Sequence, residues 1–257
     1  MAEALNSISS SKSALRGLQK VVIDRLGRRI IGGHIAPGDF LATEPELGAE
    51  FGVSRTSVRE AMRVLSAKGI VEIRQKIGTR VQEKKFWNIF DADILRWHHE
   101  EGQGDAVMRD LIELRQILEP AASRLAAGRA TIDNHRQLKV AITAMERGVD
   151  SPEAYAQADL DFHLAVYNAS HNSLMLQFGT VVGDFLRRAF LIQQGIVREP
   201  SELLKDVSLH SQVYNAIDRG DGEAAAKAML LVVLEGKSSL IQALESIELS
   251  DARARAE

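Results

Sequence analysis

The sequence contains no cysteine, which excludes disulfide bonds, thiolate metal sites, iron–sulfur clusters and cysteine nucleophiles. It also lacks any window of about 18 uninterrupted apolar residues, so we expect no membrane-spanning helix. Residues 1–17 lack the apolar segment of a signal peptide and are expected to form a disordered tail, and residues 248–257 form a second expected tail. Together these absences are typical of a soluble, cytoplasmic protein.

A large excess of charge of either sign is also absent, because the formal net charge of the 257-residue chain is only −3. That value conceals an uneven distribution. Residues 12–85 hold 15 Lys and Arg against 8 Asp and Glu, whereas residues 86–257 hold 17 against 26. The length and the charge together predict two domains, of which the basic one meets a polyanion. Charge alone does not distinguish a nucleic-acid surface from a basic face that is merely solvated.

The first domain, residues 18–82, begins with a pattern of three helices. Apolar positions recur at helical spacing from Leu18. Thr43 and Glu46 form a capping box that opens a second, short helix, and Ser54 can cap a third. A tight glycine-containing turn joins the second helix to the third, which is typical of a helix-turn-helix.

The third predicted helix opens with side chains that suit the major groove of DNA. A recognition helix enters the groove with its N-terminus first, where guanidinium groups bind guanine edges and phosphates, and hydroxyls reach phosphate oxygens. The candidate DNA contacts here are Ser54, Arg55, Thr56, Ser57 and Arg59. The alternative is that the serines only cap the helix and the arginines are only solvated.

Residues 70–82 predict a β-hairpin, which would complete a winged helix. Residues 70–74 alternate like a half-buried strand, and residues 79–82 can return antiparallel after a turn. Lys76 lies at the expected tip, with Thr79 close behind it, and we take both as candidate contacts to the phosphate backbone or the minor groove.

After a linker at residues 83–92, every long segment of residues 93–247 has helical periodicity, so we expect an all-helical bundle. Pro120 either kinks one of these helices or marks a boundary near Glu119. The expected helices cover about 91–100, 105–128, 133–147, 152–169, 173–195, 202–219 and 222–246. The predicted fold class is therefore mainly α, with a small β-wing in the first domain.

Asp159 and His163 stand four residues apart, which places a carboxylate and an imidazole on one helical face. With His210 as the best third ligand, they could hold Zn, Ni or Mn. Such a pair is more often a surface hydrogen bond or a satisfied buried histidine. An ion with an open position would also suit a hydrolytic or lyase enzyme, but no general base, nucleophile or Gly-rich phosphate loop accompanies the three residues.

Residues 18–82 resemble the GntR family of transcription regulators. Four motifs carry the resemblance: Pro37-Gly38-x-x-Leu41, Glu46-Leu47, Phe51-Gly52-Val53-Ser54-Arg55-Thr56-Ser57-Val58-Arg59-Glu60-Ala61, and Leu65-x-x-x-Gly69. The resemblance implies that Arg55, Thr56, Ser57 and Arg59 contact operator DNA. The sequence departs from the family at Pro45, where many members have a DNA-contacting arginine.

The second domain resembles the FCD effector domain (FadR-type), which accompanies GntR winged helices. The motifs are Glu113-Leu114-Arg115-x-x-x-Glu119, Asp159-x-x-Phe162-His163 and His210-x-x-x-x-x-Ala216-Ile217-x-x-Gly220-Asp221. In metal-binding relatives one Asp and three His hold a divalent ion, and Asp159, His163 and His210 match three of these ligands. Val232 stands at the fourth position, which leaves a three-ligand site completed by water or effector, or a pocket without metal.

The same resemblance makes Arg115 the clamp for an effector carboxylate, because a guanidinium can bind a carboxylate through two parallel hydrogen bonds. An ion pair with Glu119, four residues on, is the alternative. Residues 157–163 and 170–172 resemble the galactonate-operon repressors, so sugar acids are the leading effector class.

We therefore expect a homodimeric repressor that binds double-stranded operator DNA and is controlled by a small carboxylate. The hinge would lie at residues 83–92. The alternatives are the metal-dependent enzyme and an architectural protein that binds DNA without sequence preference, which competition between an operator and a random duplex would separate.

Overall fold

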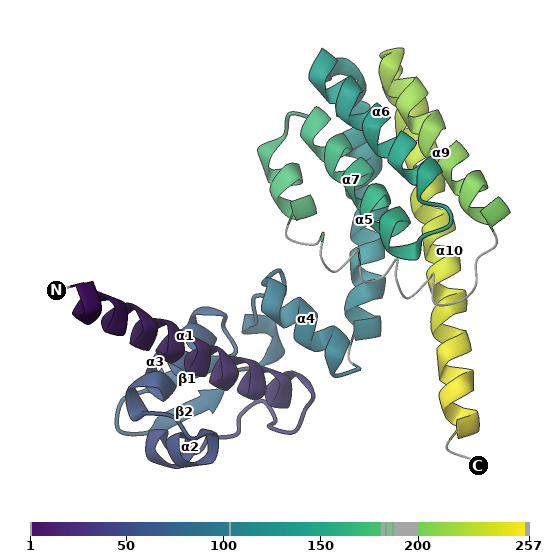
Figure 1. Ribbon diagram of the computed structural model, residues 1–257. Helices are drawn as coiled ribbons and strands as arrows, with labels where there is room; N and C mark the ends of the chain where they lie inside the picture. Colours follow the sequence, from purple (N-terminus) through teal and green to yellow (C-terminus); the bar gives the residue numbers. More distant parts are fainter. Residues whose placement is uncertain (1, 103, 181–182, 184–186, 188–199, 255–257) are drawn as a thin grey trace. The chain divides into compact units, whose positions relative to one another are not determined.

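The computed structural model describes residues 2–102, 104–180, 183, 187 and 200–254 and divides the chain into two units, residues 1–107 and 108–257 (Figure 1). The first unit contains three helices, a two-stranded sheet, a short 3-10 helix and a further helix. The second unit is helical throughout its described residues. This confirms the predicted fold class, which is mainly α with a small wing.

The N-terminal unit follows the predicted order of elements (Figure 1). Its helices are α1 (Ala2–Ile31), α2 (Glu44–Phe51), α3 (Arg55–Ala67) and α4 (Ala92–Glu100), with the 3-10 helix η1 (Lys84–Phe86) before α4. Its strands are β1 (Val71–Arg74) and β2 (Gly78–Val81), which pair antiparallel with Val71 opposite Val81 and Arg74 opposite Gly78.

Local signals explain the helix-turn-helix. The Ser54 hydroxyl accepts a hydrogen bond of 3.1 Å from the Ser57 backbone N–H and so caps α3. Gly52 ends α2 with φ +65°, a left-handed conformation that glycine adopts without a steric penalty. The core beneath joins α1 to α3 and the wing through fully buried Leu26, Val58 and Val71.

The segment after the wing packs onto the N-terminal unit, whereas the sequence led us to place a linker at residues 83–92 and a new domain from residue 93. Helix α4 contacts α1, and buried Trp97 donates an indole hydrogen bond of 2.9 Å to Asp24 Oδ1. Trp87 is also buried in this core and donates to the Gln82 carbonyl at 3.0 Å. Pairing between residues more than 70 positions apart leaves no periodic signal, and so the linker prediction missed it.

Gly27 makes room for this packing, because a Cβ atom built there would collide with the ring of Trp97. We expect Gly27→Ala to destabilise the N-terminal unit by about 1–3 kcal/mol, since the ring cannot move without disturbing a filled core. Chemical denaturation followed by tryptophan fluorescence measures the change. Gly17→Ala is the control, because the same helix has open space there. Equal stability of the two variants would contradict the expectation.

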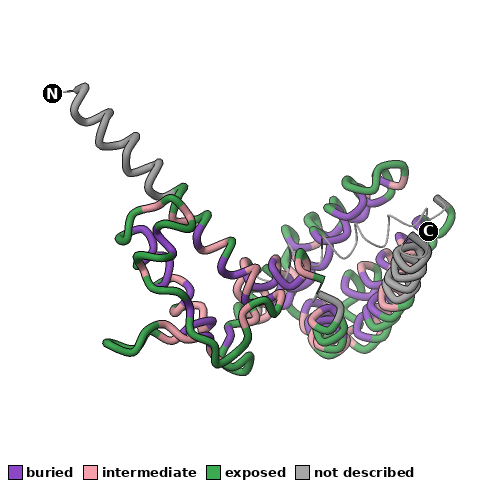
Figure 2. The backbone as a smooth tube through the Cα atoms, turned by 90° about the horizontal axis from the view of Figure 1, so that it is seen from below, coloured by how far each residue is buried: buried purple, intermediate pink, exposed green. Residues whose placement is uncertain are grey.

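The C-terminal unit is built from long helices that run beside one another (Figure 1). Its helices are α5 (Gly104–Arg129, whose first residues belong to the N-terminal unit), α6 (Ile132–Arg147), α7 (Pro152–Ala169), α9 (Pro200–Asp218) and α10 (Gly222–Ala254). Helix α6 packs on α7 and on α9, and α9 packs on α10. Where burial is described, buried residues recur between exposed ones along these helices (Figure 2). The buried residues form one core that includes Leu138, Met145, Phe162 and Met229.

Three boundaries differ from the sequence-based expectation. Pro120 lies inside α5, so no helix boundary falls at Glu119. Helix α1 extends back to Ala2 and α10 extends to Ala254, where tails were expected. Neither stretch contains a proline that would end a helix, and Gly17 lies within α1 without ending it. The structure confirms the start of the expected helix over 173–195, because residues 173–180 are helical; most of its remaining residues lie outside the described part of the chain.

Candidate functional site

The start of α3 leaves four of the five predicted DNA-contacting residues exposed to solvent. The exposed residues are Ser54, Arg55, Thr56 and Arg59, as a recognition helix requires. Ser57 is buried with 6% of its surface exposed, and its hydroxyl lies 3.0 Å from that of Ser54. Ser57 is therefore placed for helix capping, and its hydroxyl is not on the outer surface.

Arg59 is already engaged within the protein. Its Nε and Nη2 donate to the two carboxylate oxygens of Glu44 on α2 at 2.9 and 2.7 Å. The hydrogen bonds from Arg59 lower the pKa of Glu44 below its ordinary value, and Glu44 in turn raises the pKa of Arg59. Both groups are solvated, so the pair is weak, and Arg59 can exchange Glu44 for a phosphate or a guanine edge at small cost. Sequence reasoning did not identify this partner.

The wing places Lys76 at its tip, where the backbone has φ +65° and the side chain is exposed. Thr79 is half-buried, and its carbonyl accepts a hydrogen bond of 2.8 Å from the Leu41 N–H, which ties the wing to the chain before α2. Lys76 therefore has the accessibility that a phosphate contact needs, and Thr79 has less. Contact of either residue with DNA stays a prediction.

In the C-terminal unit, the fold brings the three predicted metal ligands together in the interior. Asp159 and His163 come from α7 and His210 from α9, and one ligand atom from each lies within 4.8 Å of the others. His210 Nε2 lies 3.0 Å from Asp159 Oδ1, and His163 Nε2 lies 3.7 Å from Asp159 Oδ2. The side chains of all three residues are at most 4% exposed.

Neighbouring groups orient both imidazoles toward Asp159. The Nδ1 of His210 lies 2.8 Å from the Asp206 carbonyl, which can only accept, so Nδ1 carries a proton and Nε2 faces Asp159. The Nδ1 of His163 lies 2.9 Å from Glu119 Oε2, again with Nε2 on the Asp159 side. Acceptors behind the histidines of a metal site hold the ring in this way.

The cluster fits a divalent cation. Asp159 Oδ2 and His210 Nε2 are buried, and within the described part of the chain neither makes a hydrogen bond of acceptable direction despite the short contacts. A buried carboxylate oxygen and an imidazole nitrogen in this situation cost free energy unless a proton or a cation lies between them. Val232, at the family's fourth ligand position, is buried in the apolar core, so a cation would have three protein ligands and an open position.

Neighbouring groups of opposite charge shift the pKa values of His210 and Asp159 in the direction opposite to the effect of burial. Burial lowers the pKa of His210, but the carboxylates of Asp159 and Asp206 outweigh it and raise the pKa to about 9. Burial raises the pKa of Asp159, but His163, His210 and Arg115 outweigh it, and the pKa falls below its ordinary value. The metal-free cluster therefore favours an ionised Asp159 beside a protonated His210.

The predicted effector clamp adjoins this cluster. Arg115 on α5 is 6% exposed, and its Nη2 lies 3.2 Å from His163 Nε2. Its Nε donates to Glu119 Oε1 at 2.6 Å, and its Nη2 lies 3.3 Å from Glu119 Oε2. The ion pair that sequence analysis offered as the alternative is thus present and buried. The sequence placed Glu119 beside Arg115 but gave no sign that Glu119 also contacts His163.

Comparison with known proteins identifies both units. The bacterial regulatory proteins of the gntR family match residues 18–81, and the FCD domain matches residues 110–234. The galactonate operon transcriptional repressor of Escherichia coli strain K12 is 31% identical over 212 residues, which cover 82% of this chain and 92% of that protein. The chain belongs to the GntR family, with a C-terminal FCD domain.

Two further proteins are similar to this GntR-family regulator. The uncharacterized HTH-type transcriptional regulator YieP of E. coli strain K12 is 33% identical over 218 residues, or 84% of this chain and 92% of that protein. The solved structure of Lar, which controls expression of the agr system of Listeria monocytogenes, aligns with a TM-score of 0.59 at 23% identity over 87% of this chain and 96% of its own. At this identity, the similarity to Lar shows a shared fold and nothing more.

The family is one of transcription regulators, so this GntR-family protein is a DNA-binding regulator, and the enzyme alternative is wrong. The Asp–His–His cluster is then to be understood as part of a regulatory domain. None of the described helices is long and apolar enough to cross a bilayer.

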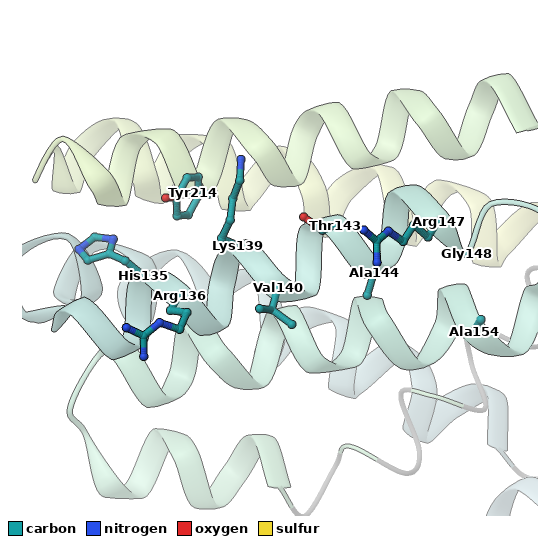
Figure 3. A pocket seen from close by; sticks show the side chains of 10 residues that line it. All are labelled: His135, Arg136, Lys139, Val140, Thr143, Ala144, Arg147, Gly148, Ala154 and Tyr214. Atoms are coloured by element: carbon teal, nitrogen blue, oxygen red, sulfur yellow. The ribbon is translucent and has the colours of Figure 1, made fainter.

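An open groove of about 680 Å³ on the surface of α6 does not coincide with the buried cluster (Figure 3). Its lining residues are His135, Arg136, Lys139, Val140, Thr143, Ala144, Arg147, Gly148, Ala154 and Tyr214. Two of its basic groups are engaged locally, since Arg136 donates to Asp133 at 2.9 Å and the Lys139 ammonium lies 5.6 Å from the centre of the Tyr214 ring. We assign this groove no ligand.

Acid should destabilise the FCD domain through Glu119. Burial raises its pKa, but Arg115 and His163 outweigh this effect and bring the pKa from 4.5 to about 2. The unfolded chain binds a proton near the ordinary pKa while the folded chain does not, so stability falls as the pH drops through this window. The loss is about 3 kcal/mol. Denaturant titrations of metal-free protein between pH 7 and 2.5 measure it.

Glu119→Gln should reduce this acid dependence, to which Asp159 with its lowered pKa also contributes, whereas Glu113→Gln should retain it in full. Glu113 is an exposed carboxylate on the same helix, so its substitution removes the same charge without touching Arg115. Parallel pH profiles for the unmodified protein and Glu119→Gln would show that Glu119 is not the cause.

Proposed function

We propose that this regulator represses transcription by binding a palindromic operator as a homodimer, and that a small carboxylate bound in the FCD domain weakens that binding. The observation that carries the proposal is a buried guanidinium, Arg115, beside a buried cluster of Asp159, His163 and His210. A guanidinium next to a cation site suits a ligand that has both a carboxylate and further oxygen donors. Bacterial operator DNA lies in the cytoplasm, so we propose that the protein acts there.

Sugar acids are the proposed effector class. An aldonate has one carboxylate for Arg115 and hydroxyl oxygens for a divalent ion. Asp159, His163 and His210 would hold this ion, and its open position would polarise and orient the bound oxygen atoms. The relative named as a galactonate operon repressor supports the same class.

The proposed DNA contacts are Arg55, Thr56 and Arg59 at the start of α3 and Lys76 at the wing tip. In a homodimer, two recognition helices must meet half-sites about one helical turn apart. Effector binding reduces operator affinity if it favours an arrangement of the two units in which this spacing is lost.

In vitro selection from a random duplex library would first supply the operator, and fluorescence anisotropy would then measure its dissociation constant. With nickel present, saturating D-galactonate should weaken operator binding by about tenfold or more, a typical allosteric coupling. An unchanged operator affinity in protein shown to bind D-galactonate would refute the effector control. Equal affinity for the selected operator and a random duplex would instead support an architectural DNA-binding protein.

A further inference from the structure

Glu119 connects the two parts of the proposed effector site. It lies on α5, is 1% exposed, and contacts both Arg115 on its own helix and His163 on α7. The Tyr167 hydroxyl also donates to its Oε1 at 3.5 Å. One buried carboxylate is therefore the partner of both the guanidinium and a candidate metal ligand.

The edge of Arg115 formed by Nε and Nη2 is the one that Glu119 holds, at 2.6 and 3.3 Å. This is the geometry with which a guanidinium binds any carboxylate, including that of a ligand. An incoming carboxylate must compete with Glu119 for these two donors. Glu119 does not lose all its partners in the exchange, because His163 Nδ1 lies 2.9 Å from its Oε2.

We propose that Glu119 is the resident carboxylate of the Arg115 clamp, that the effector carboxylate displaces it, and that Glu119 also positions His163 for the divalent ion. The inference rests on the proposed function, since it takes Arg115 as the effector's partner. Glu119 is then a positioning residue with two opposite effects: it lowers the affinity for the carboxylate and raises the affinity for the ion.

The opposite signs give a test that simple structural damage would not reproduce. In Glu119→Gln, we expect D-galactonate to bind metal-free protein about tenfold more tightly, because the clamp is no longer occupied by a charged competitor. We expect nickel alone to bind about tenfold more weakly, because an amide is a poorer acceptor for His163 than a carboxylate. Isothermal titration calorimetry measures both constants.

Glu119→Asp provides a second variant that keeps the charge beside Arg115 and so protects folding. Its side chain is shorter and holds Arg115 and His163 less closely. We therefore expect tighter D-galactonate binding and weaker nickel binding, each by a smaller factor than in Glu119→Gln. Glu113→Gln, an exposed site on the same helix, should change neither constant. Weaker binding of both ligands to the Glu119 variants, or no change in either, would overturn the proposal.

The unmodified protein offers a check that needs no substitution at Glu119. In ¹⁵N-labelled protein, saturating D-galactonate should shift the Nε–Hε resonance of Arg115, assigned by its absence from Arg115→Gln, because the 2.6 Å contact with Glu119 is broken. An unmoved resonance in ligand-saturated protein would overturn the displacement. If Arg115→Gln binds D-galactonate as tightly as the unmodified protein, the proposed clamp itself fails, which is a different result from failure of the Glu119 exchange alone.

Discussion

Replacing Arg55 with alanine is expected to weaken binding to the selected operator by about 1–3 kcal/mol and to relax the preference at one base pair. Arg55 is the first residue of α3 and is exposed, so its guanidinium can reach a base edge when the helix enters the major groove. Anisotropy titrations against the operator, single-base variants and a random duplex at fixed salt measure both effects.

Two controls separate base reading from general attraction to DNA. Arg63→Ala changes the same residue type two turns further along α3, where the guanidinium donates to Glu60 at 2.6 Å, and should have little effect. Lys76→Ala should weaken binding to all sequences alike and reduce the salt slope by about one unit if this lysine touches only phosphate. Uniform weakening by Arg55→Ala would show that Arg55 is a phosphate contact, and an unchanged affinity would contradict its place in the interface.

Replacing His210 with glutamine is expected to reduce nickel affinity by about 100-fold or more, because the cluster would keep only two of its three ligands. The matched control is His135→Gln, a half-buried histidine of the same unit outside the cluster. Calorimetric titration of metal-stripped protein gives the dissociation constant and the stoichiometry. Unchanged binding in His210→Gln would exclude the cluster as the metal site. A parallel loss in both variants would point to an unrelated effect of changing a histidine.

The helix-turn-helix and its wing could be predicted well because their signals are local. A cap at Ser54, a left-handed glycine at position 52 and alternating residues in the wing act over a few positions, and the structure has α2, α3, β1 and β2 within one residue of the expected bounds. The four-residue spacing of Asp159 and His163 is local in the same sense. It correctly placed the two side chains on one helical face.

Contacts between distant segments account for the misses. The burial of Ser57 depends on the packing of α3, and the bidentate pair of Arg59 with Glu44 joins two helices. The docking of α4 depends on Trp97 filling the space at Gly27. None of these contacts follows a regular spacing of residues along the sequence, because each forms only when separate helices pack against one another.

The amino-acid sequence by itself determined the class of protein, because helix caps, periodicity and family motifs are properties of short segments. It also indicated Asp159, His163, His210 and Arg115 as candidate site residues, because carboxylates and imidazoles are metal ligands and a guanidinium binds carboxylates. Only the tertiary structure decided that these groups share one buried cluster with Glu119 between them. Burial and charge pairing act through space, and the folded packing of α5, α7 and α9 sets the distances on which both depend.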